Sequence, residues 1–443
     1  MVKENTIKKG YKQTEIGIIP EDWEVKTSVD LCIKIQDGTH FSPKLGGNDY
    51  LYITSKNIGH GYLDISNAER IDTSQHRKIY ARCDVKNGDM LLTKDGANTG
   101  NAAINYLREE FSLLSSVAFL RFSYKHYDSR FFLQFILSNI GLLRIKELMS
   151  GNAITRLTLE KIKGFYFPVP PTLSEQTAIA EVLSDTDALI ENLENQIAKK
   201  KAIKQGTMQQ LLTGQKRLPG FGKKQGYKQT EIGVIPEDWD CLKITEVIIP
   251  SRGSIKIGPF GSALKKEYLI DNGFKVYGQE NIYRKDMSIG DRFITSAYFR
   301  ELKSCEIVSG DFLISMMGTV GQCMLVPERI APGIMDSHLL RIKFDTSKIN
   351  PYFITHLFET KIISNQIKQL SVGGIMEGLS SKIIKSIFIP VPRTKSEQTA
   401  IATVLSDMDS EIEVLEQKCA KYKQIKQGMM HQLLTGKIRL VNK

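Results

Sequence analysis

The chain has 443 residues, and 60 Lys and Arg against 49 Asp and Glu give it a formal net charge of +11. A content of 41% apolar and 25% charged residues excludes a disordered or fibrous chain, and the length allows roughly two to four domains, each with its own core. The sequence contains no apolar run near the ~20 residues that span a bilayer and no secretory signal, so we expect a cytoplasmic protein without a membrane partner. The positive charge favours an anionic partner.

The chain is a tandem duplication. The segment GYKQTEIGIIPEDW at 10–23 recurs at 226–239 with one change, Ile18 to Val234, and the segment 172–214 recurs at 394–436 with about 30 of 43 positions identical. Periods of 216 and 222 residues are far longer than a solenoid unit, so each copy contains at least one domain. In chain order we expect a shared segment at 1–25, a variable domain at 26–171, a long helix at 172–214, a linker with the second shared segment at 215–241, a second variable domain at 242–393 and a second long helix at 394–443.

The two variable domains have the pattern of α+β domains. Short β-branched or aromatic runs predict strands at 50–54, 90–93, 117–122, 275–277, 312–315 and 339–344. Helical periodicity covers 131–150 in the first domain and 352–370 in the second. Each domain has about 19 basic and 14 acidic residues, so each carries a charge of about +5.

The repeated 43-residue segment predicts a long amphipathic helix. Thr172 with Glu175 matches a capping box, which Thr394 with Glu397 repeats. The helix would be about 60 Å long, which is more than one globular domain covers, so we expect the two copies to pair as a coiled coil. Leu189 falls on the apolar stripe, Gly206 and its repeat indicate a kink or a close backbone approach, and the lysines around Lys204 indicate a solvated face. The expected core residues are Ile179, Val182, Leu183, Ile190, Leu193, Ile401, Val404, Leu405, Ile412 and Leu415.

Motifs for chemistry are scarce. The sequence has no G-x-x-x-x-G-K-[ST] loop and no G-x-G-x-x-G after a strand, and its histidines and six single cysteines have no metal-ligand spacing. Glu24-Val25-Lys26 after Asp22 superficially matches a nuclease cluster, but the spacing is lost in the second copy. His40, in a polar turn near Lys44, fits a contact with phosphate or a base edge as well as a hydrogen-bonded turn histidine.

These motifs resemble a known family. A helix with SEQ-x-AIA near its start and QLLTG at its end occurs twice, and a PEDW segment precedes each variable domain. This combination resembles the specificity subunit of type I restriction-modification enzymes over essentially the whole chain. The resemblance implies an α+β fold in which two β-rich target recognition domains are separated by two long antiparallel coiled-coil helices, with pseudo-twofold symmetry from the tandem duplication.

The resemblance also implies a function and partners. Such a subunit is not itself an enzyme: it binds a bipartite, asymmetric target in double-stranded DNA and directs adenine methylation and restriction by other subunits. Two methyltransferase subunits and two restriction-translocation subunits are the expected partners. S-adenosylmethionine, ATP and magnesium are expected in those partners, and this chain is expected to hold no cofactor and no metal.

Polar, Gly-punctuated loops supply the candidate DNA contacts. Side chains in such loops can reach phosphates and base edges in the major groove. Asn57 and Asn281 occupy corresponding positions in the two copies, so a turn-capping role is an alternative for both. The candidates are Thr39, His40, Lys44, Ser55, Lys56, Asn57, Lys94 and Asn98 in the first domain and Lys256, Ser262, Gln279, Asn281 and Arg284 in the second.

Two other functions remain open from the residues. One is a stand-alone DNA-cleaving or DNA-modifying enzyme, for which Glu24 would be the discriminating residue. The other is a coiled-coil scaffold that binds only proteins, in which exchange of the second variable domain would leave a methylated sequence unchanged.

Overall fold

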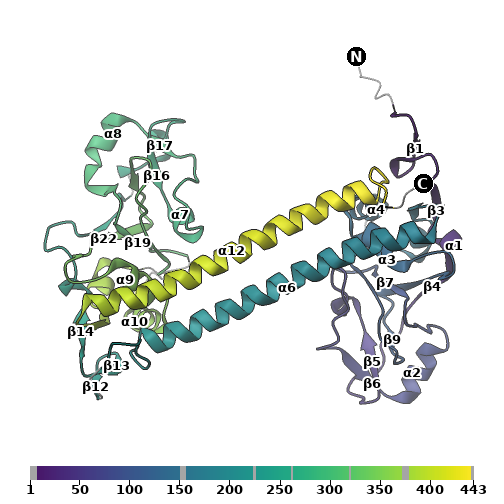
Figure 1. Cartoon of the computed structure of the whole chain (residues 1–443), viewed down its shortest axis with the longest axis horizontal. Coiled ribbons are helices and arrows are strands. Elements are labelled where there is room, and N and C mark those ends of the chain that lie inside the picture. The colour runs from purple at the N-terminus through teal and green to yellow at the C-terminus, as the bar shows by residue number, and fades with distance from the viewer. Residues whose placement is uncertain are drawn as a thin grey trace. The chain divides into compact units, whose positions relative to one another are not determined.

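The computed structural model of the chain describes residues 7–149, 156–222, 226–260, 263–318, 321–371 and 379–440. The chain forms two compact units, one made of residues 1–194 and 417–443 and the other of residues 195–416. Each unit therefore contains one variable domain and one half of each of the two long helices, α6 (Leu173–Leu211) and α12 (Lys395–Leu433) (Figure 1).

A four-stranded antiparallel sheet with the order β4-β10-β7-β8 forms the centre of the first unit. Successive side chains of a strand point to opposite faces, so Met90 and Leu92 pack against helices α3 and α6, whereas Leu91 and Phe119 pack against a second sheet, β6-β5-β9. The unit thus has a helical layer, a central sheet and a small outer sheet. The strands are β4 (Cys32–Asp37), β5 (Tyr50–Ile53), β6 (Glu69–Ile71), β7 (Met90–Thr93), β8 (Ala102–Ile104), β9 (Ser112–Leu113) and β10 (Val117–Phe122).

Shorter elements complete the first unit. The hairpin β1 (Tyr11–Thr14) and β2 (Gly17–Pro20) precedes β3 (Glu24–Thr27), which pairs antiparallel with β11 (Tyr166–Val169) immediately before α6. The helices are α1 (Ser28–Leu31), η1 (Ser55–Asn57), α2 (Thr73–Tyr80), α3 (Ser129–Leu137), α4 (Asn139–Met149) and α5 (Leu159–Lys163).

The second unit repeats this architecture. Its central sheet has the order β15-β22-β19-β20; Phe312 and Ile314 face the helices, whereas Leu313 and Leu339 face the outer sheet β17-β16-β21-β18. The strands are β12 (Tyr227–Thr230), β13 (Gly233–Pro236), β14 (Trp239–Lys243), β15 (Ile255–Ile257), β16 (Phe274–Tyr277), β17 (Phe293–Ile294), β18 (Glu306–Ile307), β19 (Phe312–Ser315), β20 (Cys323–Leu325), β21 (Gly333–Met335), β22 (Leu339–Ile342) and β23 (Phe388–Pro392). The helices are η2 (Ile244–Glu246), η4 (Lys266–Tyr268), α7 (Gln279–Tyr283), α8 (Ser296–Glu301), η5 (Lys303–Cys305), α9 (Pro351–Phe358), α10 (Lys361–Ser371) and α11 (Ser381–Lys385).

One predicted helix in each variable domain is in fact two helices. The run predicted at 131–150 breaks at Ser138, whose backbone is extended at φ −70° and ψ 160°. The reason is a close turn: a Cβ on Gly141 would lie 2.2 Å from the carbonyl oxygen of Phe135, so only glycine lets α4 begin there. The run predicted at 352–370 is likewise divided between α9 and α10.

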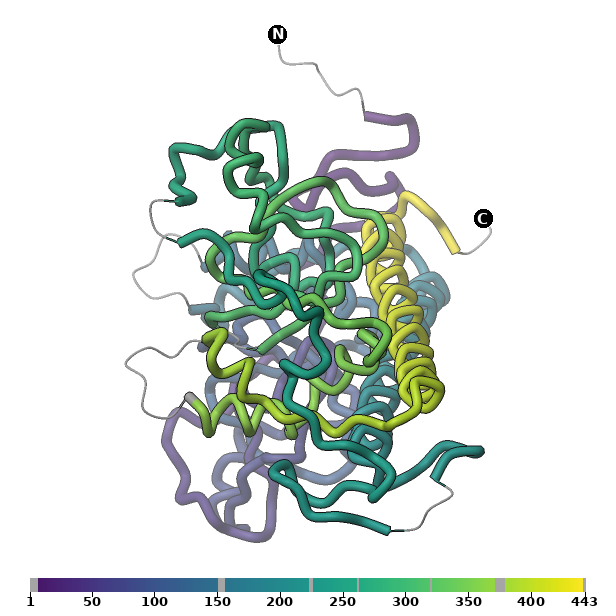
Figure 2. The backbone as a smooth tube through the Cα atoms, turned by 90° about the vertical axis from the view of Figure 1, so that its left-hand side faces the viewer, coloured from purple at the N-terminus to yellow at the C-terminus, as the bar shows by residue number. Residues whose placement is uncertain are grey.

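Within each unit the two long helices run antiparallel and lie side by side (Figures 1 and 2). In the first unit Lys426 of α12 pairs with Asp187 of α6 at 2.5 Å. In the second unit Lys204 of α6 pairs with Asp409 of α12 at 2.6 Å, which is the same pair with the two helices exchanged. The predicted antiparallel, pseudo-symmetric pairing is therefore confirmed. The prediction of a solvated lysine face is wrong for Lys204 and Lys426, because their side chains are only 12% and 13% exposed.

The helix-pair core is largely as predicted. Leu183 and Leu405 are fully buried, and each also joins the core of its variable domain, so the first turns of each long helix belong to that domain as much as to the helix pair. Leu189 is 36% exposed and is not a core residue. A Cβ on Gly206 would meet no atom within 4 Å, so the expected close backbone approach is absent from the described residues. The buried predicted residues are Ile179, Leu183, Ile190, Leu193, Ile401, Leu405 and Ile412, and the half-buried ones are Val182, Val404 and Leu415.

Arg439, which follows α12, joins three parts of the first unit. Its guanidinium binds the buried carboxylate of Glu175 at the start of α6, with an Nη2–Oε2 distance of 2.7 Å, and lies 3.0 Å from the Asp22 carboxylate. The same guanidinium lies 5.8 Å from the ring centroid of Trp23, which is fully buried. The N-terminal shared segment is thereby fixed to both long helices.

Arg217 makes the same contacts in the second unit. It binds Glu397 at 2.6 Å and Asp238 at 2.8 Å, and its guanidinium lies 5.6 Å from the ring of Trp239. The predicted capping box at each helix start is therefore half wrong: Thr394 accepts a hydrogen bond from the backbone N–H of Glu397 at 3.4 Å, but the glutamate carboxylate binds the distant arginine. A sequence pattern shows only local partners, so it did not reveal this ion pair.

His356 of α9 lies in a charged contact between the second variable domain and the helix pair. Its Nε2 is 3.2 Å from the hydroxyl of Ser406, and its Nδ1 is 3.8 Å from the carboxylate of Asp409. Burial lowers the pKa of His356, with Glu359 and Asp409 opposing that shift and Lys204 adding to it. The histidine is thus held as the neutral form over a wider pH range than in an unfolded chain.

Candidate nucleic-acid interface

Two loops of the first variable domain are joined by the candidate residues themselves. Asn98, in the loop after β7, donates from Nδ2 to the carbonyl oxygen of Ser55 at 3.4 Å, and the backbone N–H of Ser55 donates to the hydroxyl of Ser116 at 3.2 Å. Lys56 is exposed next to them, so three candidates share one surface. Lys44 is exposed on a separate loop, which is held by its backbone N–H to the Gln75 amide at 2.5 Å.

Asp37 at the end of β4 organises a charged cluster with Lys94 and His40. The Nζ of Lys94 lies 3.1 Å from its carboxylate, and both side chains are buried. His40 is exposed, and its Nε2 lies 3.2 Å from Asp37 Oδ2, the same carboxylate oxygen that Lys94 approaches. Thr39 is buried, with its backbone N–H donating to Leu113 O at 2.8 Å. In this arrangement Thr39 and Lys94 support the loop, whereas the exposed His40 would exchange its contact with Asp37 for one with a ligand.

Asn57 and Asn281 are turn caps in both domains. The Asn57 side chain accepts a hydrogen bond from the N–H of Thr54 at 2.9 Å and donates to Asp64 O at 3.1 Å. Asn281 accepts from the N–H of Gly278 at 2.9 Å and donates to two carbonyl oxygens at 3.0 Å. Both amides are buried, so the structural alternative holds for this pair.

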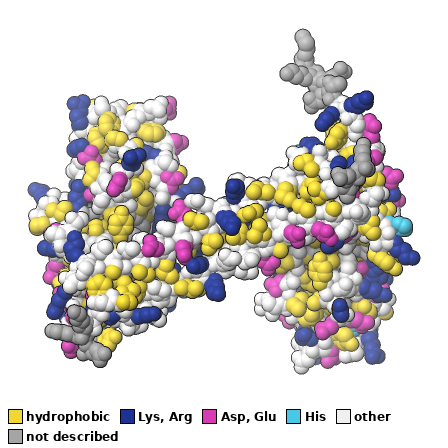
Figure 3. Space-filling view, viewed as in Figure 1, with side chains coloured by type: hydrophobic (Ala, Val, Ile, Leu, Met, Phe, Trp, Pro, Cys, Tyr) yellow, Lys and Arg dark blue, Asp and Glu magenta, His cyan; other side chains and the backbone are white. Residues whose placement is uncertain are grey.

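The other candidates of the second domain lie at two separate places, with Gln279 and Arg284 at the two ends of α7 and Lys256 on β15. Arg284 is exposed at the end of α7, and Gln279 at its start accepts a hydrogen bond from the hydroxyl of Tyr283. Lys256 lies on β15, which is the edge strand of the central sheet farthest from β20, and it lines a pocket there. Ser262 lies outside the described residues. On the face shown in Figure 3, Lys and Arg side chains are scattered over each unit and form no single continuous patch.

Arg341 is not among the site residues predicted from the sequence; it is 6% exposed and lines the same pocket as Lys256. It stands alone among Leu339, Leu340 and Ile342 in a strand that the sequence predicts. A single cation inside an apolar strand is the signal that could have identified it, because such a group is rarely buried without a partner.

The nuclease-like triplet is an ion pair on a short strand. The Nζ of Lys26 lies 2.8 Å from the carboxylate of Glu24, and both residues are on β3. In the described part of the chain no three His, Cys, Asp or Glu side chains are grouped so that they could hold a metal ion. None of the described helices is both long enough and apolar enough to cross a membrane.

Comparisons with known proteins identify the family. The chain matches the type I restriction modification DNA specificity domain over residues 20–202 and again over 236–425. The chain belongs to this family. It is 26% identical over 436 residues to the type I restriction enzyme MjaVIII specificity subunit of Methanocaldococcus jannaschii, a match that covers 96% of this chain and 95% of the relative.

Solved structures share the fold of this specificity subunit. The S subunit of a type I restriction-modification system from M. genitalium superposes with a TM-score of 0.58 at 15% identity, covering 93% of this chain and 96% of that one. A chain from a structure on complex assembly and conformational transition of the type I R-M system gives a TM-score of 0.51 at 14% identity, covering 95% and 99%. The predicted fold class is confirmed, and the chain is the non-catalytic DNA-recognition component of such a system.

Proposed function

We propose that this specificity subunit binds a bipartite, asymmetric target in double-stranded DNA, with each target recognition domain contacting one half-site. The observation that carries the proposal is that two different variable domains are held to the long helices by the same set of contacts. Arg439 and Arg217 make equivalent contacts in the two units, while the domains held by those contacts differ at most surface positions. Two domains that are held by equivalent contacts but have different surfaces favour a DNA target with two half-sites that are similarly placed and differ in sequence.

Charge and loop chemistry support DNA as the ligand. Each domain carries about +5, which would neutralise about 6 to 10 phosphates in total and make affinity fall steeply with salt. Exposed loop side chains would supply base contacts at about 1–3 kcal/mol for each good bidentate pair. The exposed candidates are His40, Lys44, Lys56, Asn98 and Arg284.

The duplicated helices support a symmetric set of partners. The Lys–Asp pair between α6 and α12 occurs once in each unit, so one kind of partner subunit would find two equivalent surfaces. We therefore propose two methyltransferase subunits and two restriction-translocation subunits, which would bring S-adenosylmethionine, ATP and magnesium. The helix pair would set the number of unread base pairs between the half-sites, and the complex would act in the cytoplasm.

Mapping of methylated adenines across a host genome, with and without this chain, tests the proposal. We expect a motif with two short fixed halves and an unread gap, which disappears when the chain is deleted. An unchanged methylation pattern would contradict the proposal. Magnesium-dependent cleavage by the purified chain, abolished by Glu24→Gln, would instead support a stand-alone enzyme.

A further inference from the structure

The second target recognition domain has a buried arginine where the first has a phenylalanine. Met90 pairs with Leu120 in the first central sheet, and Phe312 pairs with Ile342 in the second. Met90 and Phe312 each follow a Gly-Asp dipeptide, so the registers of the two sheets correspond. One residue earlier on each partner strand, Phe119 therefore corresponds to Arg341. By the same registers Gln36 of β4 corresponds to Lys256 of β15.

In the first domain the ring of Phe119 occupies the position that corresponds to Arg341. Phe119 is fully buried in the core between the two sheets. The guanidinium of Arg121 lies 5.3 Å from its ring and is bound to Asp89 at 2.8 Å and to Asp84 at 3.3 Å. Lys34 pairs with Asp84 beside the same ring. Two cations are balanced by two carboxylates, and the aromatic ring fills the space.

In the second domain the arginine is not balanced in this way. Arg341 donates hydrogen bonds to three backbone carbonyls, including Gly253 O at 3.2 Å and Ser304 O at 3.3 Å. Its Nε is buried without a hydrogen-bond acceptor, and the nearest carboxylate oxygen, on Asp311, is 3.9 Å away. Removing a charge from water is costly unless other charges compensate it, so this arrangement calls for an additional anion.

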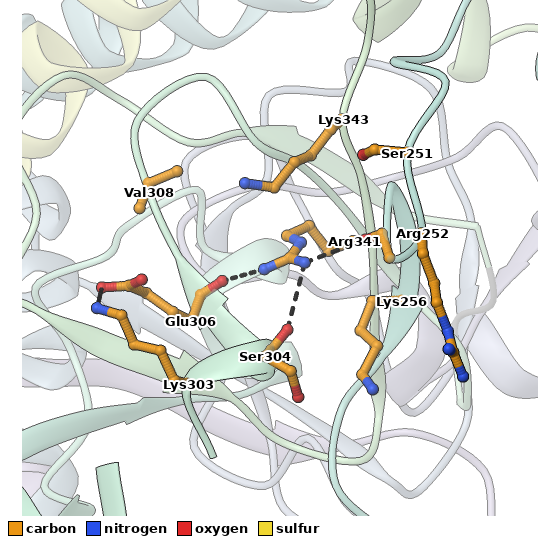
Figure 4. Close-up of a pocket in the computed structure, with 10 residues that line it drawn as sticks. Ser251, Arg252, Lys256, Lys303, Ser304, Glu306, Val308, Arg341 and Lys343 are labelled. Atoms are coloured by element: carbon orange, nitrogen blue, oxygen red, sulfur yellow. Dashed lines mark hydrogen bonds and ion pairs between the residues drawn. The ribbon is translucent and has the colours of Figure 1, made fainter. Parts of the chain in front are cut away.

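A pocket of about 500 Å³ adjoins Arg341. Figure 4 shows the arginine between Arg252 and Lys256 on one side and Lys303 with Glu306 on the other, with Lys343 above it. The lining includes five cationic side chains and a single carboxylate.

The acidic groups near the pocket do not neutralise it. Glu306 pairs with Lys303 at 2.7 Å, and Asp311 behind the pocket lies 3.5 Å from Lys343. Arg252 and Lys256 form no ion pair with any residue in the described ranges. Burial raises the pKa of Asp311, and the nearby cations Lys343 and Arg341 oppose that shift.

We infer that this pocket binds a phosphate group, which Lys256 contacts directly while the buried guanidinium of Arg341 supplies positive charge at the pocket wall. Guanidinium and ammonium groups are the side chains that bind phosphate most strongly, and the pocket is large enough for the group. The phosphate has two possible sources, the backbone of bound DNA or a free phosphate or pyrophosphate. The first source rests on the proposed function, and the second does not.

The first domain supplies the test variants, because it shows that the same sheet folds with Gln and Phe at these positions. The double variant Lys256→Gln/Arg341→Phe gives the second domain the residues of the first. Lys266→Gln/Arg329→Gln removes the same net charge from exposed positions outside the pocket and is the matched control. Lys256→Gln alone changes a half-buried surface side chain, so it tests the site even where Arg341→Phe disturbs folding.

Two measurements on the full chain distinguish the sources. In the first, inorganic phosphate and pyrophosphate are titrated and the thermal midpoint is followed. In the second, affinity for target DNA is measured against salt concentration. A DNA phosphate predicts that the double variant, and more weakly Lys256→Gln, lowers affinity about tenfold and reduces the salt slope by about 1 for each lost contact, beyond the control. A free phosphate predicts stabilisation by the titrated ion that the variants lose, with DNA affinity matching the control.

Variants that match the control in both measurements would overturn the site. Failure of the proposed function has a different signature, which is a methylation pattern that does not depend on the chain. The two ideas can therefore fail separately.

Discussion

Replacement of Arg217 by Met leaves the carboxylate of Glu397 inside the second unit without its counter-charge. The guanidinium makes two hydrogen bonds to that carboxylate, at 2.6 and 2.8 Å, and the Glu397 side chain is 5% exposed. Breaking a buried pair from one side costs about 3–5 kcal/mol, because the remaining charge is uncompensated. The contacts with Asp238, which is 26% exposed, add less than about 1 kcal/mol. We expect Arg217→Met to lower the free energy of unfolding by about 3 kcal/mol.

The double variant Arg217→Met/Glu397→Met separates the pair from the packing around it. Removing both charges restores part of the loss, because no buried charge remains, so the double variant should be more stable than the single variant by at least about 1.5 kcal/mol. Lys200→Met is the control. It breaks a pair with Glu411 whose side chains are 43% and 59% exposed, and it should cost less than about 1 kcal/mol.

The two tryptophans provide the assay. Trp23 is buried in the first unit and Trp239 in the second, and the chain has no others. In a Trp23→Phe background, tryptophan fluorescence during urea unfolding therefore reports on the second unit. A single variant that costs no more than Lys200→Met, or a double variant less stable than the single variant, would refute the assignment of Arg217 as the counter-charge of a buried carboxylate.

Three further predictions concern the core, a histidine and a cap. Leu193→Ala should cost about 2–5 kcal/mol in urea unfolding because Leu193 is 3% exposed, whereas Leu189→Ala at a 36% exposed position should cost less than about 1 kcal/mol. Burial lowers the pKa of His356, so as the pH falls the imidazole is protonated in the unfolded chain before it is protonated in the folded chain. The free energy of unfolding should therefore fall as the pH drops below about 6.5. His356→Gln, which introduces the residue found at Gln134 in the first domain, should remove that pH dependence. Asn281→Ala should cost about 1–3 kcal/mol by thermal unfolding and leave the methylated sequence unchanged, because the amide caps a turn.

Local patterns predicted the regular elements well. Strands β7, β10 and β19 begin and end at the predicted residues, and the apolar period of the repeated segment gave both long helices. These features depend on side chains close together in the chain. The break at Ser138 was missed because it depends on contact between Gly141 and the preceding backbone turn.

The contacts of the polar loops could not be predicted in the same way. Lys56 and Lys94 both lie in polar, loop-rich sequence, yet Lys56 is exposed and Lys94 is buried against Asp37. The difference is set by a partner more than 50 residues away in the chain. Arg341 is visible in the sequence as a lone cation in an apolar strand, but its correspondence to Phe119 follows only when the registers of the two sheets are compared.

Exchange of residues 242–393 for the corresponding domain of another specificity subunit tests the central claim most directly. Methylated adenines would be mapped in cells that carry the hybrid chain together with unchanged partner subunits. We expect one half of the recognised sequence to change, while the other half and the length of the gap remain as they were. A sequence that is unchanged, or one in which both halves change, would contradict an account in which each domain recognises its own half-site.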